Sequence, residues 1–219
     1  MRWAKREKRD INPTKIKISA RINDMEWTGI HLLPKAKVIL LEGTRKVIEE
    51  DKVKLACFAE KLAVRFPHAT FRTGNATGSD EAFAEGIARV NPKALQYVLP
   101  YRSMRKKNIM AEAAFYSLEE VCDTDLMCLA EATCEATPAN SSFVQYYVKT
   151  RVRNRMTSKA LYLLRDTLKV LGSEKLNLAP ADIGFFYTDP GNPTGGGTGH
   201  TMRVCRGRKV PVFDQAEWM

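Results

Sequence analysis

Short apolar runs alternate with helical patterns along most of the chain, from residue 37 onward. The apolar runs lie at residues 38–41, 69–72, 95–99, 183–187 and 210–213, and each has the length of a buried strand. Helical patterns cover residues 48–65, 105–122 and 152–171, and helices are also expected after the glycine-rich stretches at 74–80 and 194–201. Strands that alternate with helices are typical of βα units. We therefore expect an α/β fold, with an open, mainly parallel sheet flanked by helices.

Two segments depart from this alternation. Residues 123–142 have no clear period, and we expect an insertion of helical turns and loop there. Residues 15–22 alternate polar and apolar positions, which places Ile16, Ile18 and Ile22 on one face of a strand. The basic residues on its other face suit a sheet edge, or pairing with the same strand of a second subunit. We divide the chain into an N-terminal basic extension (1–36) and one domain (37–219), and we expect a homo-oligomer, a dimer or higher.

The basic residues are concentrated at the N-terminal end. The 219 residues include 35 Lys and Arg against 25 Asp and Glu, a formal net charge of +10. Residues 1–21 hold eight of the basic residues and two of the acidic ones, so the rest of the chain is nearly balanced. A basic extension attracts nucleic-acid phosphates without reading their sequence, and it equally fits a solvated tail that maintains solubility.

Several function classes lack their characteristic residues. No stretch approaches ~18 consecutive apolar residues and no apolar run follows the basic N-terminus, so we expect neither a membrane span nor a secretory signal. The five cysteines form no C-x-x-C pair, which favours a reduced, cytoplasmic protein without a zinc site. The chain lacks H-E-x-x-H, G-x-S-x-G and a P-loop lysine, so zinc hydrolases, serine hydrolases and P-loop ATPases have no support.

The strongest candidate site is the glycine-rich stretch at 194–201, between a predicted strand and a predicted helix. Clustered glycines let backbone N–H groups approach an anion, and a helix start presents unpaired N–H groups and its positive dipole. We interpret this stretch as a phosphate cradle; an exposed flexible loop is the alternative. The candidate ligand-binding residues are Gly195, Gly196, Gly197, Thr198, Gly199, His200 and Thr201.

Two further loops follow predicted strands. The first, after residues 38–41, contains Gly43, Thr44 and Arg45. Ligands in open parallel sheets bind outside the carboxyl ends of the strands, so the loops predict one shared pocket. The candidate residues of the second loop are Gly74, Asn75, Gly78, Ser79 and Asp80.

Three carboxylates lie at or near the predicted strand ends, namely Glu42, Asp80 and Asp189. A carboxylate in such a pocket is a candidate acid–base group. Each also fits an ordinary structural role, and Asp80 in particular suits the first turn of a helix, where it favours the dipole.

The order of these loops resembles the SLOG superfamily, which includes the Smf/DNA-processing protein A family and the LOG-type phosphoribohydrolases once labelled lysine decarboxylases. The resemblance covers about residues 37–214 and rests mainly on the glycine–threonine–histidine stretch. Arg153 and Asn154, at the start of the long predicted helix, resemble an Arg-Asn element of some small members. The resemblance implies a Rossmann-like sheet that binds a nucleotide or nucleotide-derived ligand, with Arg153, Asn154 and Arg203 as side-chain contacts.

One departure from the family pattern bears on catalysis. The phosphoribohydrolases carry the motif PGGxGTxxE, whose Glu serves in cleaving the N-glycosidic bond. Aligning the glycines puts His200 where the motif has Thr and Arg203 where it has Glu. A cation cannot replace a carboxylate in this role, but it binds phosphate, so the substitution favours binding over hydrolysis.

Three functions remain open. The first is binding of a nucleotide or nucleotide-derived phosphate ligand at the glycine loops, with no other cofactor and no metal. The second is single-stranded nucleic-acid binding of DNA-processing type, through the N-terminal extension and through basic residues interleaved with tyrosines at 97–107 and 146–155. The third is a nucleotide N-glycoside hydrolase that uses another carboxylate, such as Glu42, Asp80 or Asp189.

Overall fold

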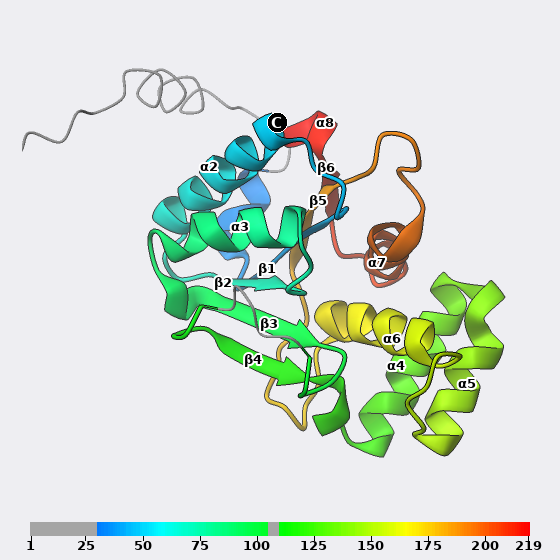
Figure 1. Cartoon of the computed structure of the whole chain (residues 1–219). Helices are drawn as coiled ribbons and strands as arrows, with labels where there is room; N and C mark the ends of the chain where they lie inside the picture. Colours follow the sequence, from blue (N-terminus) through cyan, green and yellow to red (C-terminus); the bar gives the residue numbers. More distant parts are fainter. Residues whose placement is uncertain (1–29, 105–109) are drawn as a thin grey trace, which may run out of the picture.

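A six-stranded, all-parallel open sheet forms the centre of the molecule, which confirms the predicted fold class of an open, mainly parallel sheet flanked by helices (Figure 1). The computed structural model describes residues 30–104 and 110–219, so the strand expected at 15–22 lies outside the described residues. The strand order is β4-β3-β2-β1-β5-β6. The strands are β1 (Val38–Gly43), β2 (Thr70–Thr73), β3 (Leu95–Leu99), β4 (Ala114–Ser117), β5 (Ile183–Tyr187) and β6 (Val212–Asp214).

Strand β1 is buried on both faces. Ile39 and Leu41 belong to one hydrophobic cluster, whereas Val38 and Leu40 belong to a second cluster across the sheet. Parallel strands between two helical layers need apolar side chains on both sides. This is why the sequence of β1 is a continuous apolar run and does not alternate.

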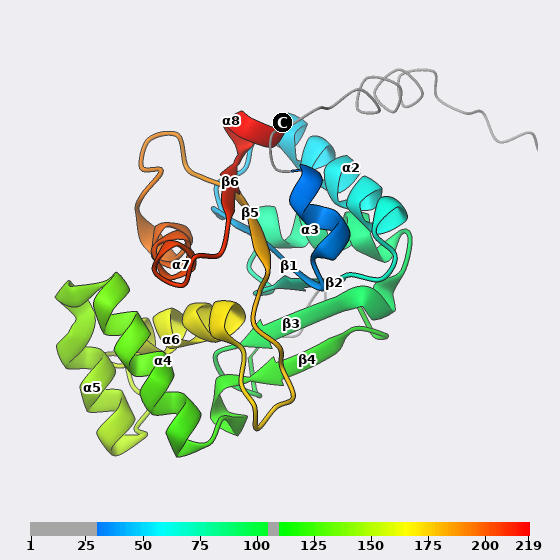
Figure 2. The same ribbon diagram turned by 180° about the vertical axis from the view of Figure 1, so that it is seen from behind.

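Helices cover both faces of the sheet (Figures 1 and 2). The face of Ile39 is covered by η1 (Ile30–Lys35), α2 (Glu49–Arg65), α3 (Ser79–Ala88) and α8 (Gln215–Trp218). The other face is covered by α6 (Ser158–Leu171) and α7 (Gly196–Gly207). Helices α4 (Asp123–Ala136) and α5 (Ser141–Thr150) pack outside α6, and short 3-10 turns lie at η2 (Pro92–Ala94), η3 (Leu118–Glu120) and η4 (Pro138–Asn140).

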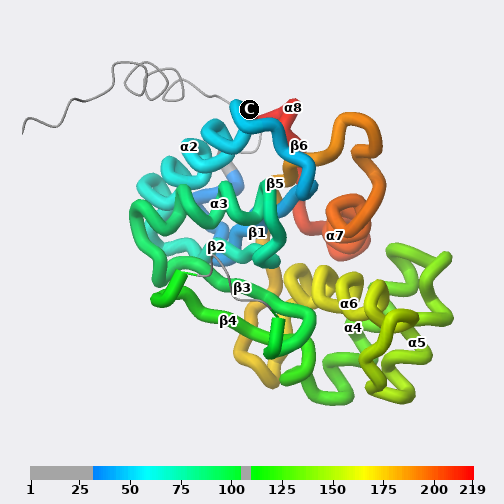
Figure 3. The backbone as a smooth tube through the Cα atoms, in the orientation of Figure 1, coloured from blue at the N-terminus to red at the C-terminus, as the bar shows by residue number. Residues whose placement is uncertain are grey.

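The C-terminal helix α8 lies beside α2 (Figure 3). Trp218, which is 1% exposed, stacks on Phe58 of α2 with ring centroids 4.3 Å apart. Phe185 of β5 meets the same two rings edge-on. The last residues of the chain therefore complete the core on this face of the sheet.

The sequence-based expectation of a helix over 105–122 is wrong for the described part of that segment. Residues 114–117 form strand β4, which pairs with residues 96–99 of β3, and η3 follows. Strand pairing is a long-range interaction that local helical spacing does not reveal, and it overrides weak helix propensity.

Two other boundaries differ from the expected ones. The segment 123–142 consists of α4, η4 and the start of α5, so it is largely regular helix. The helix expected from 152 begins at Ser158, because Asn154 and Thr157 form a turn first. Asn154 Oδ1 accepts the N–H groups of Met156 and Thr157, and Thr157 Oγ1 donates to the carbonyl of Val152 at 2.8 Å.

None of the helices that the structure describes is both long and apolar enough to cross a lipid bilayer.

Helices α2 and α3 cross closely at Gly86, which gives a testable prediction. A Cβ at Gly86 would lie 2.0 Å from the carbonyl oxygen of Ala56 and 2.9 Å from Ala59 Cβ. We expect Gly86→Ala to lower the free energy of unfolding by about 1–3 kcal/mol, because the two helix backbones must separate. Gly207→Ala in α7, where a Cβ meets nothing within 4 Å, is the control and should be neutral or slightly stabilising. Equal urea unfolding curves for Gly86→Ala and wild type would contradict this packing.

Candidate functional site

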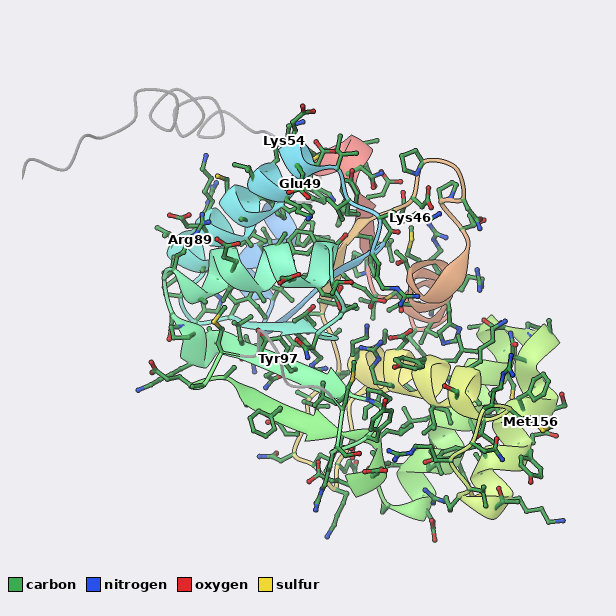
Figure 4. All side chains as sticks on the ribbon, in the orientation of Figure 1. Lys46, Glu49, Lys54, Arg89, Tyr97 and Met156 are labelled. Atoms are coloured by element: carbon green, nitrogen blue, oxygen red, sulfur yellow. The ribbon has the colours of Figure 1, made fainter. Side chains whose placement is uncertain are left out.

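A cleft of about 790 Å³ opens at the carboxyl ends of the strands, between β1 and β5. Strands β2, β3 and β4 lie on one side of β1, and β5 and β6 lie on the other, so the strand order reverses at this point. In open α/β sheets such a reversal is where ligands bind. Figure 4 shows Lys46 near the loop that runs from β5 to α7, and Lys46 Nζ lies 3.9 Å from Asp189 Oδ2 of that loop.

The structure brings the three predicted loops together around this cleft. The predicted residues that line it are Glu42, Gly43, Thr44, Arg45, Gly74, Asn75, Asp80, Asp189, Gly195, Gly196, Gly197 and Thr198. The predicted residues outside its lining are Gly78, Ser79, Arg153, Asn154, Gly199, His200, Thr201 and Arg203. Lining residues that the sequence did not suggest include Lys46, Met104, Tyr162, Arg165, Asp166 and Asn192.

Asp80 and Ser79 hold two of these loops in place. The carboxylate of Asp80 accepts the N–H groups of Gly74, Ala76 and Gly43 at 3.1, 3.2 and 3.4 Å. Ser79 Oγ donates to the carbonyl of Thr44 at 2.7 Å. Asp80 is 2% exposed and its oxygens are engaged by backbone donors, so its position fits a structural role better than acid–base catalysis.

A buried ionic network forms the inner wall of the cleft. Lys169 Nζ lies 2.5 Å from Glu42 Oε2 and 2.9 Å from Asp166 Oδ1, while Thr201 Oγ1 donates to Glu42 Oε1 at 3.0 Å. Arg165 Nε lies 2.9 Å from the same Asp166 oxygen, but outside hydrogen-bond geometry, so that contact is ionic. All four charged side chains are at most 7% exposed.

Arg165 also ties α6 to the ends of two strands. Its Nη1 donates to the carbonyl of Gly74 after β2 at 2.8 Å and to that of Val98 in β3 at 3.4 Å. Arg165 was not predicted as a site residue, because charged helix residues usually face water. The available signal was the spacing, since Arg165 and Lys169 follow Leu161 at steps of four and so continue the apolar stripe of the helix.

The two carboxyl groups of the network differ in charge state. Burial raises the pKa of Glu42 to about 7, even though Lys169 favours its charged form. Burial also acts to raise the pKa of Asp166, but the adjacent Arg165 and Lys169 outweigh it and the pKa is lowered. Near neutral pH the inner wall therefore contains one permanently charged carboxylate and one carboxyl group that exchanges a proton.

Most of the glycine-rich stretch forms the first turns of α7, and only Thr194 and Gly195 lie in the loop before it. The helix begins at Gly196, after Gly195 as N-cap, and no side chain caps its free N–H groups. Gly197 allows a close approach, because a Cβ there would lie 2.9 Å from Asp166 Oδ2. The carboxylate of Asp166 thus faces the positive end of the α7 dipole.

His200 and Thr201 point away from the cleft mouth and into the protein. His200 is 0% exposed; its Nδ1 lies 2.7 Å from Thr137 Oγ1, and its Nε2 lies 3.1 Å from both Thr167 Oγ1 and the carbonyl of Leu163. Burial lowers the pKa of His200 to about 4. The sequence predicted His200 as a ligand-binding residue of the phosphate cradle, but the side chain is buried one helical turn beyond Gly196 and faces α6.

The remaining predicted contacts also have partners within the protein. Arg203 donates to the carbonyls of Ala136 and Thr194 at 2.6 and 2.8 Å, and so fixes the loop before α7. Arg153 lies on the surface with its guanidinium 4.3 Å from the centre of the Tyr101 ring. Asn154 forms the turn before α6, and Gly199 packs against the backbone of Thr194.

Within residues 30–104 and 110–219, no group of three or more His, Cys, Asp and Glu side chains is arranged to hold a metal ion. The five cysteines are free thiols.

The neutral, buried His200 gives a prediction on pH. In the unfolded chain a histidine takes up a proton near pH 6.5, whereas in the folded protein His200 resists protonation down to about pH 4. The unfolded state therefore binds more protons between these values, and folding stability falls as the pH drops from 6.5 to 4. We expect His200→Gln to remove this loss, on the order of 3 kcal/mol, from urea unfolding measured across that range.

Glu42 has a raised pKa, so between pH 4.5 and 7 it makes the folded protein more stable as the pH drops, which is opposite to the effect of His200. Because Glu42 is present in both proteins, its contribution cancels when the unfolding free energy of His200→Gln is compared with that of wild type. The exposed His68→Gln variant, which keeps His200, should follow the wild-type profile. If the unfolding free energies of His200→Gln and wild type depend on pH in the same way, His200 is not held neutral in the folded protein.

Comparisons with known proteins leave the family of this chain open. No family model matches it, and no curated protein matches it. One solved structure, DNA processing protein A from Helicobacter pylori, described with its single-stranded DNA binding mode, aligns with a TM-score of 0.46 and 16% identity over 84% of this chain and 67% of that chain. At this level of similarity the alignment assigns neither family nor function, and the resemblance to the SLOG superfamily stays a prediction.

Proposed function

We propose that the cleft between β1 and β5 binds a nucleotide or nucleotide-derived ligand. The observation that carries the proposal is the position of the cleft, which lies where the strand order reverses and opens onto the uncapped start of α7. Its volume of about 790 Å³ falls within the range of roughly 300–1,000 Å³ typical of small-molecule sites.

The lining supplies groups for both ends of such a ligand. Arg45 and Lys46 are exposed beside the cleft and supply positive charge for a phosphate. Tyr162 and Met104 add an aromatic ring and an apolar side chain from another wall, surfaces that suit a base. These side chains come from segments far apart in the sequence, and only the fold assembles them.

We predict that nucleoside monophosphates bind to the wild-type protein in isothermal calorimetry and that Arg45→Ala weakens this binding about tenfold or more. The physical reason is the loss of a charge-assisted hydrogen bond to phosphate, worth roughly 1.5–3 kcal/mol. Lys93→Ala is the control, because this substitution also removes one positive charge. Lys93 lies just before β3, at the amino ends of the strands and away from the cleft. No binding across a panel of mono-, di- and cyclic nucleotides would refute the proposal.

Single-stranded nucleic acid is a second candidate ligand, favoured by the surface next to the cleft. Residues 151–156 between α5 and α6 are exposed and include three arginines. The guanidinium of Arg153 stacks on the ring of Tyr101. Tyr101 also lies beside Tyr162 of the cleft, and burial together with Tyr101 raises the pKa of Tyr162. Guanidinium groups beside tyrosine rings suit a phosphate backbone with stacked bases. Acidic partners, such as Asp123 for Arg151, offset part of this charge.

This candidate predicts salt-dependent binding of a labelled oligothymidylate. Replacing Arg153 and Arg155 with alanine should reduce the slope of log affinity against log salt by about 1.4, since each phosphate contact on a single strand contributes about 0.7. The matched control is Arg65→Ala with Lys93→Ala, two exposed cations elsewhere on the surface. Unchanged affinity of the arginine double variant for the oligothymidylate, or binding that does not depend on salt, would show that residues 151–156 do not bind single-stranded nucleic acid.

A further inference from the structure

The inner wall of the cleft contains a carboxylate oxygen that the protein leaves free. Asp166 has a side chain only 3% exposed, and its Oδ1 is held by Lys169 and Arg165 at 2.9 Å each. Among the residues that the structure describes, Oδ2 has no hydrogen bond or ion pair, and it faces the first turn of α7 beside Gly197. Oδ2 is not among the fully buried polar atoms and Asp166 lines the cleft, so this oxygen is open to a hydrogen-bond donor from a ligand.

The neighbouring acidic groups do not offer a comparable acceptor. Both oxygens of Glu42 are engaged, by Lys169 and by Thr201, and Asp80 accepts three backbone N–H groups. Asp189 lies nearer the mouth, where it accepts the N–H of Gly191 and pairs with Lys46. Asp166 Oδ2 is therefore the acceptor on the inner wall that remains for a bound molecule.

The cleft consequently has opposite chemical preferences at its two ends. The mouth, with Arg45 and Lys46, attracts anions. At the inner wall Arg165 and Lys169 balance the charges of Asp166 and Glu42, and Asp166, whose pKa is lowered, offers an oxygen that only accepts hydrogen bonds. A ligand that satisfies both ends carries its phosphate outward and its hydroxyl groups inward.

We propose that Asp166 Oδ2 accepts a hydrogen bond from a ribose hydroxyl, so that the ligand of the cleft is a ribonucleotide and not a deoxyribonucleotide. This inference rests on the proposed function of the cleft. A sugar hydroxyl is a neutral hydrogen-bond donor, and acidic side chains accept hydrogen bonds from ribose hydroxyls in dinucleotide-binding sheets. The 2′-hydroxyl is also the group that separates ribonucleotides from deoxyribonucleotides.

The test compares adenosine and guanosine monophosphates with their 2′-deoxy and 3′-deoxy analogues by calorimetry on the full chain. We expect the 2′-deoxy analogue of each base to bind about 10- to 100-fold more weakly than the ribonucleotide, the usual effect of losing a hydrogen bond to a charged group. Equal affinities for the ribonucleotide and its 2′-deoxy analogue, or a loss confined to the 3′-deoxy analogue, would overturn the inference while leaving the proposed function intact. Absence of binding by every nucleotide would overturn both.

Gly197→Ala provides the decisive variant, because its Cβ would lie 2.9 Å from Asp166 Oδ2 and cover that oxygen without removing any charge from the network. We expect this variant to lose the preference for ribose, whereas Gly207→Ala in the same helix should keep it. Asp166→Asn is a second variant, and it should also lose the preference for ribose. Its folding is checked by circular dichroism, because the substitution removes the negative charge that pairs with Lys169 and Arg165. A full ribose preference in Gly197→Ala would show that Asp166 Oδ2 is not the acceptor.

Discussion

The charged side of helix α6 lies buried against the ends of the strands, and the arrangement of the whole molecule depends on how those charges are compensated. Taking an ion out of water costs several kcal/mol, so each one needs partners in fixed positions. Lys169 finds two carboxylates, and Arg165 finds Asp166 and the carbonyl of Gly74. Arg72 of β2, itself 0% exposed, donates to the carbonyl of Lys169 near the end of the same helix. These contacts fix α6 relative to β1, β2 and β3.

The same network gives the cleft its chemistry. Because α6 brings Asp166 next to the start of α7, the glycine-rich turn meets a carboxylate and not open solvent. The positive side chains Arg45 and Lys46 lie at the mouth of the cleft instead. Glu42 shares Lys169 with Asp166, so its protonation and the charge of the inner wall are linked. The side chains that hold α6 against the sheet therefore also line the cleft.

Much of the sheet could be predicted from local patterns. The runs that became β3 and β5 have the predicted bounds, because buried parallel strands need continuous apolar residues. The meeting of the loops at Gly43 and Gly74 could also be predicted, because the carboxyl ends of parallel strands lie at the same edge of the sheet. Strand β4 could not be found in this way, because its residues owe their extended form to pairing with β3. The burial of Arg165 had a signal in its spacing from Leu161, but its partners and the role of Asp166 could not be predicted, because they depend on contacts with distant segments.

By itself, the sequence determined the elements whose cause is local: apolar runs that form strands, the helical spacing of α2, and glycines that permit close backbone approach. Only the tertiary structure decided which side chains meet. It placed His200 against Thr137 and Thr167 inside the protein, used Arg203 to hold Thr194, and brought Asp166 to the cleft beside Gly197. The physical reason is that desolvation and hydrogen-bond partners depend on segments distant in sequence, whereas backbone conformation and amphipathic spacing depend on near neighbours.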